Sequence, residues 1–385
     1  MITAAATDER VACGQRFFAA EADRIAELCH RMAERFARGG RLIAFGSSPA
    51  DLSDVRHVAV EFVHPVIVGK RALPALGVPC ADAGLLARPD DIAMAFGESD
   101  DVAAAVRAAR AAGSLTVAFA PVGAEWELVV PTTDPFVAQE QVETAYHVLW
   151  ELVHVFFEHR GLLAGRHGRV LHDAGASSFL YPFLAETEAD LDAVLADIAA
   201  SAVAKAAEAG ALREATLRDG RGTLESAARA LRECFGAGGK LLAIGNGGSA
   251  TDAMDAVADL RRPPAGLPAR PAIDLTEDAP TLTAIANDIG VEAIFARQVI
   301  ALGDPGDALL SFSTSGTSGN IIAALAEARR RGLVTIAFVG YDGGRIAADA
   351  LADHVVVTRC EHIPRIQEAQ ASAWHVLRAL VEDGR

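Results

Sequence analysis

The chain has 385 residues, of which 51% are hydrophobic and 22% are charged, enough for two or three domains with sizeable cores. Its formal net charge of −16 argues against a nucleic-acid-binding protein, because phosphate backbones require a basic surface. The sequence has no run of eighteen apolar residues and no export signal at its start, so we expect neither a membrane span nor secretion. Five scattered cysteines without a Cys-x-x-Cys pair are typical of thiols in a reducing cytoplasm.

The first half predicts a long amphipathic helix followed by alternating strands and helices. The helix covers Asp8–Arg38, and a later segment of helical composition covers Ala103–Ala112. Short runs rich in Val, Ile, Leu and Ala suit strands that are buried on both faces. These runs are Arg41–Gly46, Pro65–Gly69, Ile92–Gly97, Leu115–Ala120 and Glu127–Pro131.

The second half repeats this order of elements. An amphipathic stretch, Glu186–Phe235, comes first, and Asn320–Arg331 has helical composition. The predicted strands are Lys240–Gly245, Ala272–Leu275, Ala308–Ser313, Val334–Val339 and His354–Thr358. Strand–helix alternation of this kind implies right-handed crossovers and a doubly wound α/β fold with parallel sheets.

The two halves align directly, which indicates a tandem repeat. Asp91-Ile-Ala-Met-Ala-Phe96 matches Asp307-Ala-Leu-Leu-Ser-Phe312, and Tyr146-His-Val-Leu149 matches Trp374-His-Val-Leu377. Both halves also contain Gln-Glu followed by His. We therefore predict a first domain at 1–160, a linker at 161–184 rich in Gly, Ser and His, and a second domain at 185–385.

The second half contains two turns suited to binding a phosphate, Gly245-Asn-Gly-Gly-Ser249 and Ser313-Thr-Ser-Gly-Thr-Ser318. Each follows a predicted strand and leads into a helix, where backbone N–H groups at the positive end of the helix dipole are unpaired. Glycine lets an anion approach the main chain, and the hydroxyl groups add donors. In place of the second turn the first half carries Glu98, Asp100 and Asp101, which would repel a phosphate.

These motifs resemble the sugar isomerase (SIS) domain, specifically the phosphoheptose isomerase family, which converts sedoheptulose 7-phosphate into a heptose 7-phosphate. The matching segments, which cover nearly the whole second half, are 245–249, 282–288, 295–298, 313–318, 342–344 and 365–368. The first half resembles the family only through its strands and its metal-type residues. The resemblance implies two doubly wound, flavodoxin-like SIS domains in tandem with flanking long helices.

The family presents His-x-x-x-Glu on one helix and Gln followed eight residues later by His on another, and these four residues resemble a zinc site. In the first half His57, Glu61, Gln139 and His147 match all four positions. Since residues at i and i+4 share one helical face, His57 and Glu61 can converge on one ion. The second half keeps the Gln and the His, as Gln367 and His375, but has Asp255 and Asp259 in place of His and Glu. A shorter Asp would leave a base out of reach.

Each half has thus lost a different part of the site, which we interpret as one surviving composite site with a phosphate cradle from the second half and metal ligands from the first. The predicted catalytic residues are Glu61, His147 and His375, and the predicted zinc ligands are His57, Glu61, Gln139 and His147. The predicted substrate-binding residues are Asn246, Gly247, Gly248, Ser249, Asn287, Asp288, Ser313, Thr314, Ser315, Ser318 and Gln367. Either Gln139 and His147 or Gln367 and His375 complete the site, and we favour the first pair.

The resemblance implies an aldose–ketose isomerase that converts D-sedoheptulose 7-phosphate into D-glycero-D-manno-heptose 7-phosphate through an enediolate, for nucleotide-activated heptose synthesis. The alternative is a non-catalytic SIS domain that senses a sugar phosphate or docks a protein, and a weaker one is an isomerase of another phosphosugar. We expect a cytoplasmic homodimer that forms a pseudo-tetramer of SIS domains, with a phosphorylated sugar as partner and neither nucleic acid nor membrane.

Overall fold

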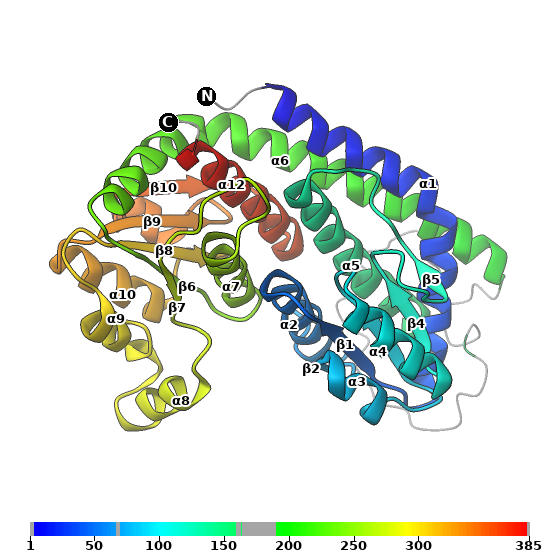
Figure 1. Ribbon diagram of the computed structural model, residues 1–385. Coiled ribbons are helices and arrows are strands. Elements are labelled where there is room, and N and C mark those ends of the chain that lie inside the picture. Colours follow the sequence, from blue (N-terminus) through cyan, green and yellow to red (C-terminus); the bar gives the residue numbers. More distant parts are fainter. Residues whose placement is uncertain (1–3, 67–69, 159–162, 164–189, 383–385) are drawn as a thin grey trace. The chain divides into compact units, whose positions relative to one another are not determined.

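The computed structural model describes residues 4–66, 70–158, 163 and 190–382 (Figure 1). The chain divides into two compact units. Unit 1 comprises Met1–Val11, Pro135–Glu140 and Glu208–Arg385, and unit 2 comprises Ala12–Asp134 and Gln141–Ala207. This division differs from the predicted one, because each of three long helices contributes residues to both units: α1 (Ala4–Ala37), α5 (Pro135–Glu158) and α6 (Leu191–Gly236). The predicted linker, 161–184, lies outside the described residues except for Leu163.

Unit 2 contains a parallel five-stranded sheet in the order β2-β1-β3-β4-β5. Its strands are β1 (Leu42–Gly46), β2 (Ala75–Pro79), β3 (Ile92–Ala95), β4 (Leu115–Ala118) and β5 (Trp126–Glu127). Three helices connect them: α2 (Pro49–Val63), α3 (Cys80–Leu86) and α4 (Asp100–Ala111).

Unit 1 contains a second parallel sheet, in the order β7-β6-β8-β9-β10. Its strands are β6 (Leu241–Ile244), β7 (Ala272–Asp274), β8 (Ala308–Ser313), β9 (Val334–Val339) and β10 (His354–Val357). Its helices are α7 (Gly248–Arg261), α8 (Ala279–Asp288), η2 (Val291–Ala293), α9 (Ala296–Leu302), α10 (Gly319–Arg330), α11 (Gly344–Ala348) and α12 (Ile363–Glu382).

Within each unit the strand order is 2-1-3-4-5, which is the flavodoxin-like form of the doubly wound fold. This order confirms the predicted fold class. Two predicted strands of unit 2 differ from the structure. The fifth strand, β5, is Trp126–Glu127 and overlaps the predicted Glu127–Pro131 only at Glu127, and the second strand is β2, Ala75–Pro79, and not Pro65–Gly69. The described part of that run, Pro65 and Val66, is not in a strand, and 67–69 lie outside the described residues. Apolar composition alone does not distinguish such a run from the strand that pairs with β1.

Both faces of the unit 1 sheet are covered by apolar side chains, as a parallel sheet requires. Successive residues of a strand point to opposite faces. Leu241 and Ala243 of β6 accordingly lie in a cluster with residues of α6, α7 and α12. Leu242 and Ile244 lie in a second cluster, with residues of α9 and α10.

Each unit has an equivalent ion pair at the start of its sheet. In unit 2 the Asp91 carboxylate accepts hydrogen bonds from the backbone N–H and the guanidinium of Arg41. In unit 1 Asp307 accepts from the backbone N–H and the ammonium group of Lys240 in the same way. The two units thus share this side-chain contact as well as their strand order.

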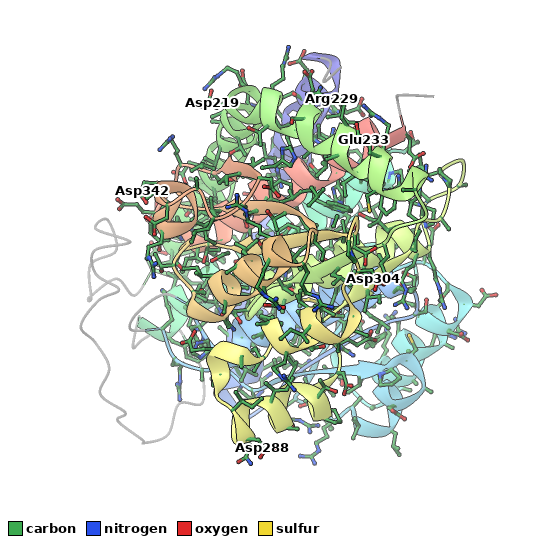
Figure 2. The ribbon with its side chains drawn as sticks, turned by 90° about the vertical axis from the view of Figure 1, so that its left-hand side faces the viewer. Asp219, Arg229, Glu233, Asp288, Asp304 and Asp342 are labelled. Atoms are coloured by element: carbon green, nitrogen blue, oxygen red, sulfur yellow. The ribbon has the colours of Figure 1, made fainter. Side chains whose placement is uncertain are left out.

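Acidic side chains project from the surface of unit 1, among them Asp219, Asp304 and Asp342 (Figure 2), in keeping with the net charge of −16. In the part of the chain that the structure describes, none of the helices has the length and apolar character needed to cross a bilayer.

Candidate functional site

In unit 1 the two predicted phosphate-binding turns follow the neighbouring strands β6 and β8. Ligands of open α/β sheets bind outside the carboxyl ends of the strands, where the strand order reverses, and this is that place. The first turn depends on two glycines. A Cβ at Gly245 would collide with the backbone of Ser249, and Gly247, the residue before α7, has φ 57°, a conformation that favours glycine.

A pair of amide side chains joins the two turns. Asn246 Nδ2 donates to Asn320 Oδ1 (3.0 Å), and Asn320 Nδ2 donates to Asn246 Oδ1 (2.8 Å). Asn320 is 6% exposed and belongs to the first turn of α10. Asn246 was predicted and Asn320 was not, although an amide directly after a hydroxyl-rich turn was a usable signal.

The hydroxyl groups of the β8 turn differ in exposure. Ser313 is buried, and its Oγ accepts from the backbone N–H of Gly316 (3.1 Å). Ser315 is partly exposed, and its Oγ accepts from the Thr317 hydroxyl (3.1 Å). Thr314 and Ser318 are also partly exposed. The turn therefore has both structural hydroxyl groups and accessible ones.

One carboxylate borders the β8 turn. Glu292 of η2 packs against Gly319, at the start of α10, so one acidic group lies beside the β8 turn. The predicted substrate residues Asn287 and Asp288 are exposed on α8, where Asn287 Nδ2 donates to Asp288 Oδ1 (2.7 Å). Figure 2 shows Asp288 on this helix. Among the described residues, no hydrogen bond joins either of them to the two turns. Their part in substrate binding therefore stays a prediction.

The corresponding turn of unit 2 is occupied by a carboxylate of the protein itself. Asp51 Oδ2 accepts from the backbone N–H groups of Ser47 (3.2 Å) and Ser48 (2.8 Å), and Ser48 caps α2. A Cβ at Gly97, after β3, would collide with the same carboxylate. Asp51 thus takes the position of an anion between the β1 and β3 turns, which the sequence analysis missed.

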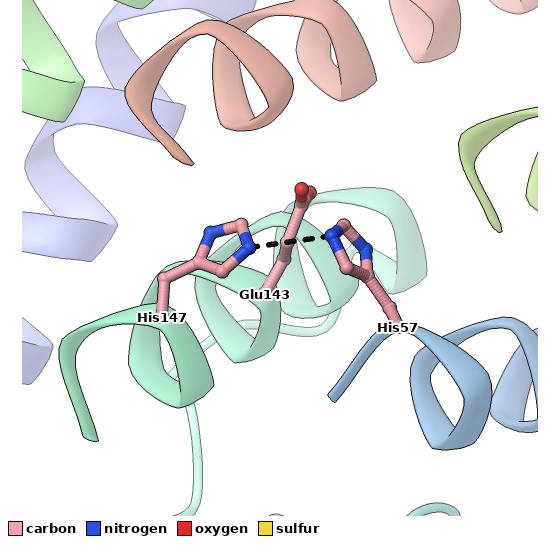
Figure 3. Close-up of side chains that lie close together, drawn as sticks. All are labelled: His57, Glu143 and His147. Carbon is pink, nitrogen blue, oxygen red and sulfur yellow. Dashed lines mark hydrogen bonds between the residues drawn. The ribbon is translucent and has the colours of Figure 1, made fainter. Parts of the chain in front are cut away.

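Unit 2 brings together three residues that could hold a metal ion: His57, Glu143 and His147 (Figure 3). His57 comes from α2, and the other two lie one turn apart on α5. The His57 and His147 Nε2 atoms are 3.3 Å apart. Since two lone pairs would repel at that distance, a proton or a cation must lie between them.

Other contacts orient His57 for this role. Its Nδ1 is 3.0 Å from the Tyr146 hydroxyl, which lies 3.3 Å from Asp54 Oδ1. If Tyr146 donates to Asp54 and accepts from Nδ1–H, the Nε2 lone pair faces His147, as in metal sites with an outer carboxylate. Burial, together with His147, lowers the pKa of His57 well below its ordinary value. His57 is therefore neutral, the state that binds a metal.

Glu61 lies beside this group. Its Oε1 is 3.9 Å from His57 Nε2, and its Oε2 has no hydrogen-bond partner among the described residues. Burial and the neighbouring Glu151 raise the pKa of Glu61 to about 8. A carboxyl group that titrates near neutral pH is suited to general acid–base catalysis.

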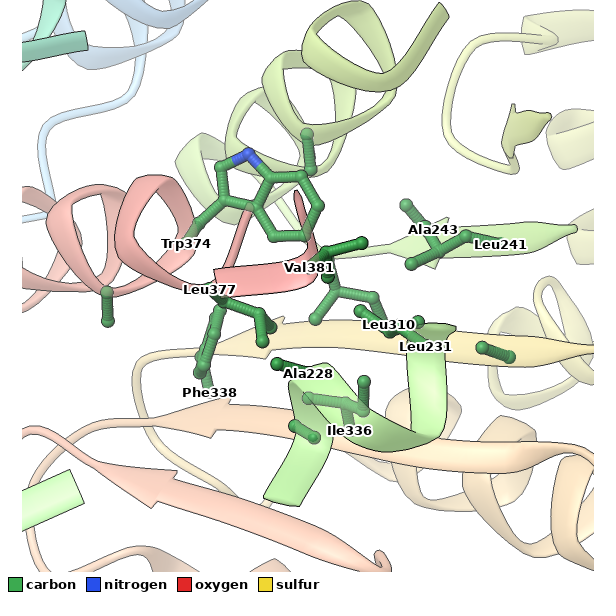
Figure 4. Close-up of a cluster of buried hydrophobic side chains, with 14 of the residues drawn as sticks. Ala228, Leu231, Leu241, Ala243, Leu310, Ile336, Phe338, Trp374, Leu377 and Val381 are labelled. Carbon is green, nitrogen blue, oxygen red and sulfur yellow. The ribbon is translucent and has the colours of Figure 1, made fainter. Parts of the chain in front are cut away.

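Unit 1 contains a second such group: Asp255, Asp259 and His375. His375 Nε2 lies 3.5 Å from a carboxylate oxygen of each aspartate. Trp374 Nε1 donates to Asp259 Oδ2 (2.8 Å). Figure 4 shows Trp374 on α12 beside the core residue Leu377, so this residue links the apolar core to the charged group.

The charges of this second group interact strongly. Burial alone would lower the pKa of His375, but Asp255, Glu140 and Asp259 outweigh it and raise the pKa to about 10. Burial and Asp255 raise the pKa of Asp259 to about 7. The His375 imidazolium therefore offsets negative charge in this group.

The predicted ligand Gln139 belongs to unit 1, where its Nε2 donates to Asp255 Oδ1 (2.6 Å). Gln367, two turns before His375 on α12, is buried. In unit 2 the carboxylate that lies with the two histidines is Glu143, which the sequence analysis missed. Its signal was present, because Glu143 precedes His147 by four residues and the equivalent residue of the second repeat is Ala371.

The family model described as SIS domain matches residues 206–340. A phosphoheptose isomerase from Desulfovibrio desulfuricans is 43% identical over 180 residues, which are 46% of this chain and 85% of that protein. One from Roseiflexus sp. is 47% identical over 157 residues, 39% of this chain and 76% of that protein. Among solved structures, the chain is similar to the C-terminal domain of glucosamine-fructose-6-phosphate aminotransferase from Francisella tularensis. The superposition covers 98% of this chain and 93% of that one, with a TM-score of 0.64 and 10% sequence identity. This last similarity concerns the fold alone.

Proposed function

The chain belongs to the phosphoheptose isomerase family of enzymes, and from this premise we propose that it converts D-sedoheptulose 7-phosphate into D-glycero-D-manno-heptose 7-phosphate. One observation carries the proposal. Helix α7 begins at the β6 turn and presents Asp255, beside His375, two turns later. Seven residues of helix span about 10 Å, a reach comparable with a seven-carbon sugar whose phosphate lies at the turn.

In this proposal the β6 and β8 turns bind the phosphate. Backbone N–H groups of Gly247 and Gly248 and the hydroxyls of Thr314, Ser315 and Ser318 supply the donors. Each charge-assisted hydrogen bond is worth roughly 1.5–3 kcal/mol. The Asn246–Asn320 pair supports the role by holding the two turns in register.

The reaction moves one proton between carbons. A base removes a proton from C1 of the ketose, the enediolate forms, and a proton is returned to C2 while the hydroxyl proton passes from O1 to O2. Two carboxyl groups have a pKa near neutrality: Asp259 in unit 1, at about 7, and Glu61 in unit 2, at about 8. His375, as an imidazolium, is the proposed acid for the oxygens, and His147 stays a predicted catalytic residue.

We propose zinc as the cofactor of unit 2. The fit rests on the donor set, in which the His57 and His147 Nε2 atoms and the Glu143 carboxylate converge, with Glu61 as a predicted fourth ligand. Two imidazoles and carboxylates without a thiolate suit a catalytic zinc. When bound, zinc would supply Lewis-acid stabilisation of developing negative charge on an oxygen.

The test is incubation of the purified chain, with and without added zinc, with sedoheptulose 7-phosphate in D₂O, followed by NMR of the product. We expect the aldose phosphate, with deuterium at C2 to the extent that the proton exchanges with solvent. Glu61→Gln and Asp259→Asn identify the base, because loss of a general base costs about 10²–10⁴-fold in rate. The absence of both turnover and deuterium incorporation would contradict the enzyme proposal and favour a sugar-phosphate sensor.

A further inference from the structure

The first two turns of α5 supply two contacts to His375. Glu140 Oε1 lies 2.9 Å from His375 Nδ1, and both side chains are fully buried. The Phe136 ring stacks on the imidazole, with the ring centroids 4.7 Å apart and an angle of 26° between the planes. We infer that Glu140, although it lies in the first sequence repeat, is the positioning residue for His375. The functional part of this inference rests on the proposed function.

Glu140 is itself held rigidly. Its Oε1 accepts from Arg10 Nε (2.9 Å), and its Oε2 accepts from Ser372 Oγ (2.6 Å). Arg213 Nη2 donates to the Glu140 backbone carbonyl (2.8 Å). A buried carboxylate with both oxygens engaged cannot rotate away, so it can fix the orientation of a histidine that donates to it.

The orientation decides which nitrogen of His375 faces the rest of the group. Because Nδ1 donates to Glu140, Nε2 is the atom that faces Asp255 and Asp259, at 3.5 Å from each. Rotation of the ring by half a turn about the Cβ–Cγ bond would exchange Nδ1 with Cδ2 and Nε2 with Cε1, so a carbon atom would face Glu140 and another would face the two aspartates. Glu140 and Phe136 together oppose that rotation.

Sequence alone would assign this role differently. Glu368 follows Gln367 and lies on the same helix as His375, which makes it the counterpart of Glu140. In the structure Glu368 pairs with Arg365 (2.9 Å), and the contact to His375 Nδ1 comes from Glu140.

The experiment is Glu140→Gln in the full chain, with Asp307→Asn as the matched control. Asp307 is also a buried carboxylate of unit 1 with a cationic partner, Lys240, but it does not contact His375. Long-range ¹H–¹⁵N spectra of ¹⁵N-histidine-labelled protein report the protonation state and hydrogen bonding of the His375 ring nitrogens, whose signals are assigned with His375→Gln. We expect Glu140→Gln to move the His375 ring signals and to lower kcat by about 10–100-fold with little change in KM. Asp307→Asn should change neither.

If Glu140→Gln does not fold, Ser372→Ala carries the test, because it removes one hydrogen bond to Glu140 and keeps the carboxylate. It should produce a smaller change of the same His375 signals. Unchanged His375 signals in a folded variant, or a kcat equal to that of Asp307→Asn, would overturn the inference. If the wild type does not turn over sugar phosphate while Glu140→Gln still shifts His375, the proposed function is wrong and the positioning role of Glu140 stands.

Discussion

The turn after β1 in unit 2 and the turn after β6 in unit 1 have the same place in the fold but opposite electrostatics. In unit 2 the third helical residue is Asp51, whose carboxylate accepts from the turn's own N–H groups. In unit 1 the third residue of α7 is Ala250. In our proposal, a carboxylate at this position decides whether the turn is open to an external anion or accepts the side chain of the protein itself.

The buried histidines of the two units differ in a similar way. In unit 2 the pKa of His57 lies well below its ordinary value because of burial and a second histidine. In unit 1 three carboxylates raise the pKa of His375 to about 10 against the effect of burial. The same helical framework thus presents a neutral imidazole in one unit and an imidazolium in the other.

The largest effect is expected from moving the carboxylate between units. Ala250→Asp should close the β6 turn to anions, because the new side chain would accept from the N–H groups that otherwise bind phosphate. Loss of one or two charge-assisted hydrogen bonds, about 3 kcal/mol, weakens sugar-phosphate binding roughly a hundredfold. Calorimetric titration measures the change. Ala250→Asn is the control without the charge, and equal affinity of the two variants would contradict this account.

The next effect concerns acid stability. Burial alone would raise the pKa of Glu140, but Arg10, His375 and Arg213 outweigh it and lower the pKa from 4.5 to about 2. Glu140 therefore stabilises the fold above pH 4.5, and this contribution, on the order of 3 kcal/mol, is lost as the pH falls from 4.5 towards 2. Urea unfolding at a series of pH values should show a flatter acid limb in Glu140→Gln than in the wild type. Equal slopes in the wild type and in Glu140→Gln would contradict the stabilising role of the ionised Glu140.

A smaller effect should test whether zinc binds at His57, Glu143 and His147 of unit 2. Tyr146→Phe removes the hydroxyl that lies between Asp54 and His57, and loss of such an outer contact costs about 10–100-fold in metal affinity. Zinc affinity is measured by competition with a chelating dye. Tyr341→Phe, the same change in unit 1, should leave the affinity unchanged. A loss of equal size in both variants would argue against a site at His57.

The smallest effect is the loss of the internal anion in unit 2. Asp51→Ala removes the capping box of α2 and should lower the free energy of unfolding of unit 2 by about 1 kcal/mol. Asp51→Asn keeps an acceptor and should cost less. Urea unfolding followed by Trp126 and Trp150 fluorescence measures both variants. A stability equal to that of the wild type would show that the carboxylate does not support the turn.

The sequence was sufficient for the fold class and for the β6 and β8 turns, because strand runs and Gly-Ser turns are local patterns. It was not sufficient for the anion-like role of Asp51. A carboxylate three residues after Ser48 predicts only a helix cap, and its contacts with the turn depend on the backbone geometry there. Glu143 was missed because the predicted ligands followed the family spacing rather than the i, i+4 spacing on α5. The contact of Gln139 with Asp255 depends on tertiary packing that joins positions 116 residues apart, which no local pattern reveals.

Helix α5 is divided between the units, with Pro135–Glu140 in unit 1 and the rest in unit 2. This division has a consequence for the expression of protein fragments. A fragment that starts after residue 184 would carry His375 but lack Glu140 and Phe136, leaving a buried imidazole without its acceptor or its stacking partner. Such a fragment would be a poor substitute for the full chain. Any cut between residues 160 and 185 would therefore separate His375 from two of the side chains that hold it in place.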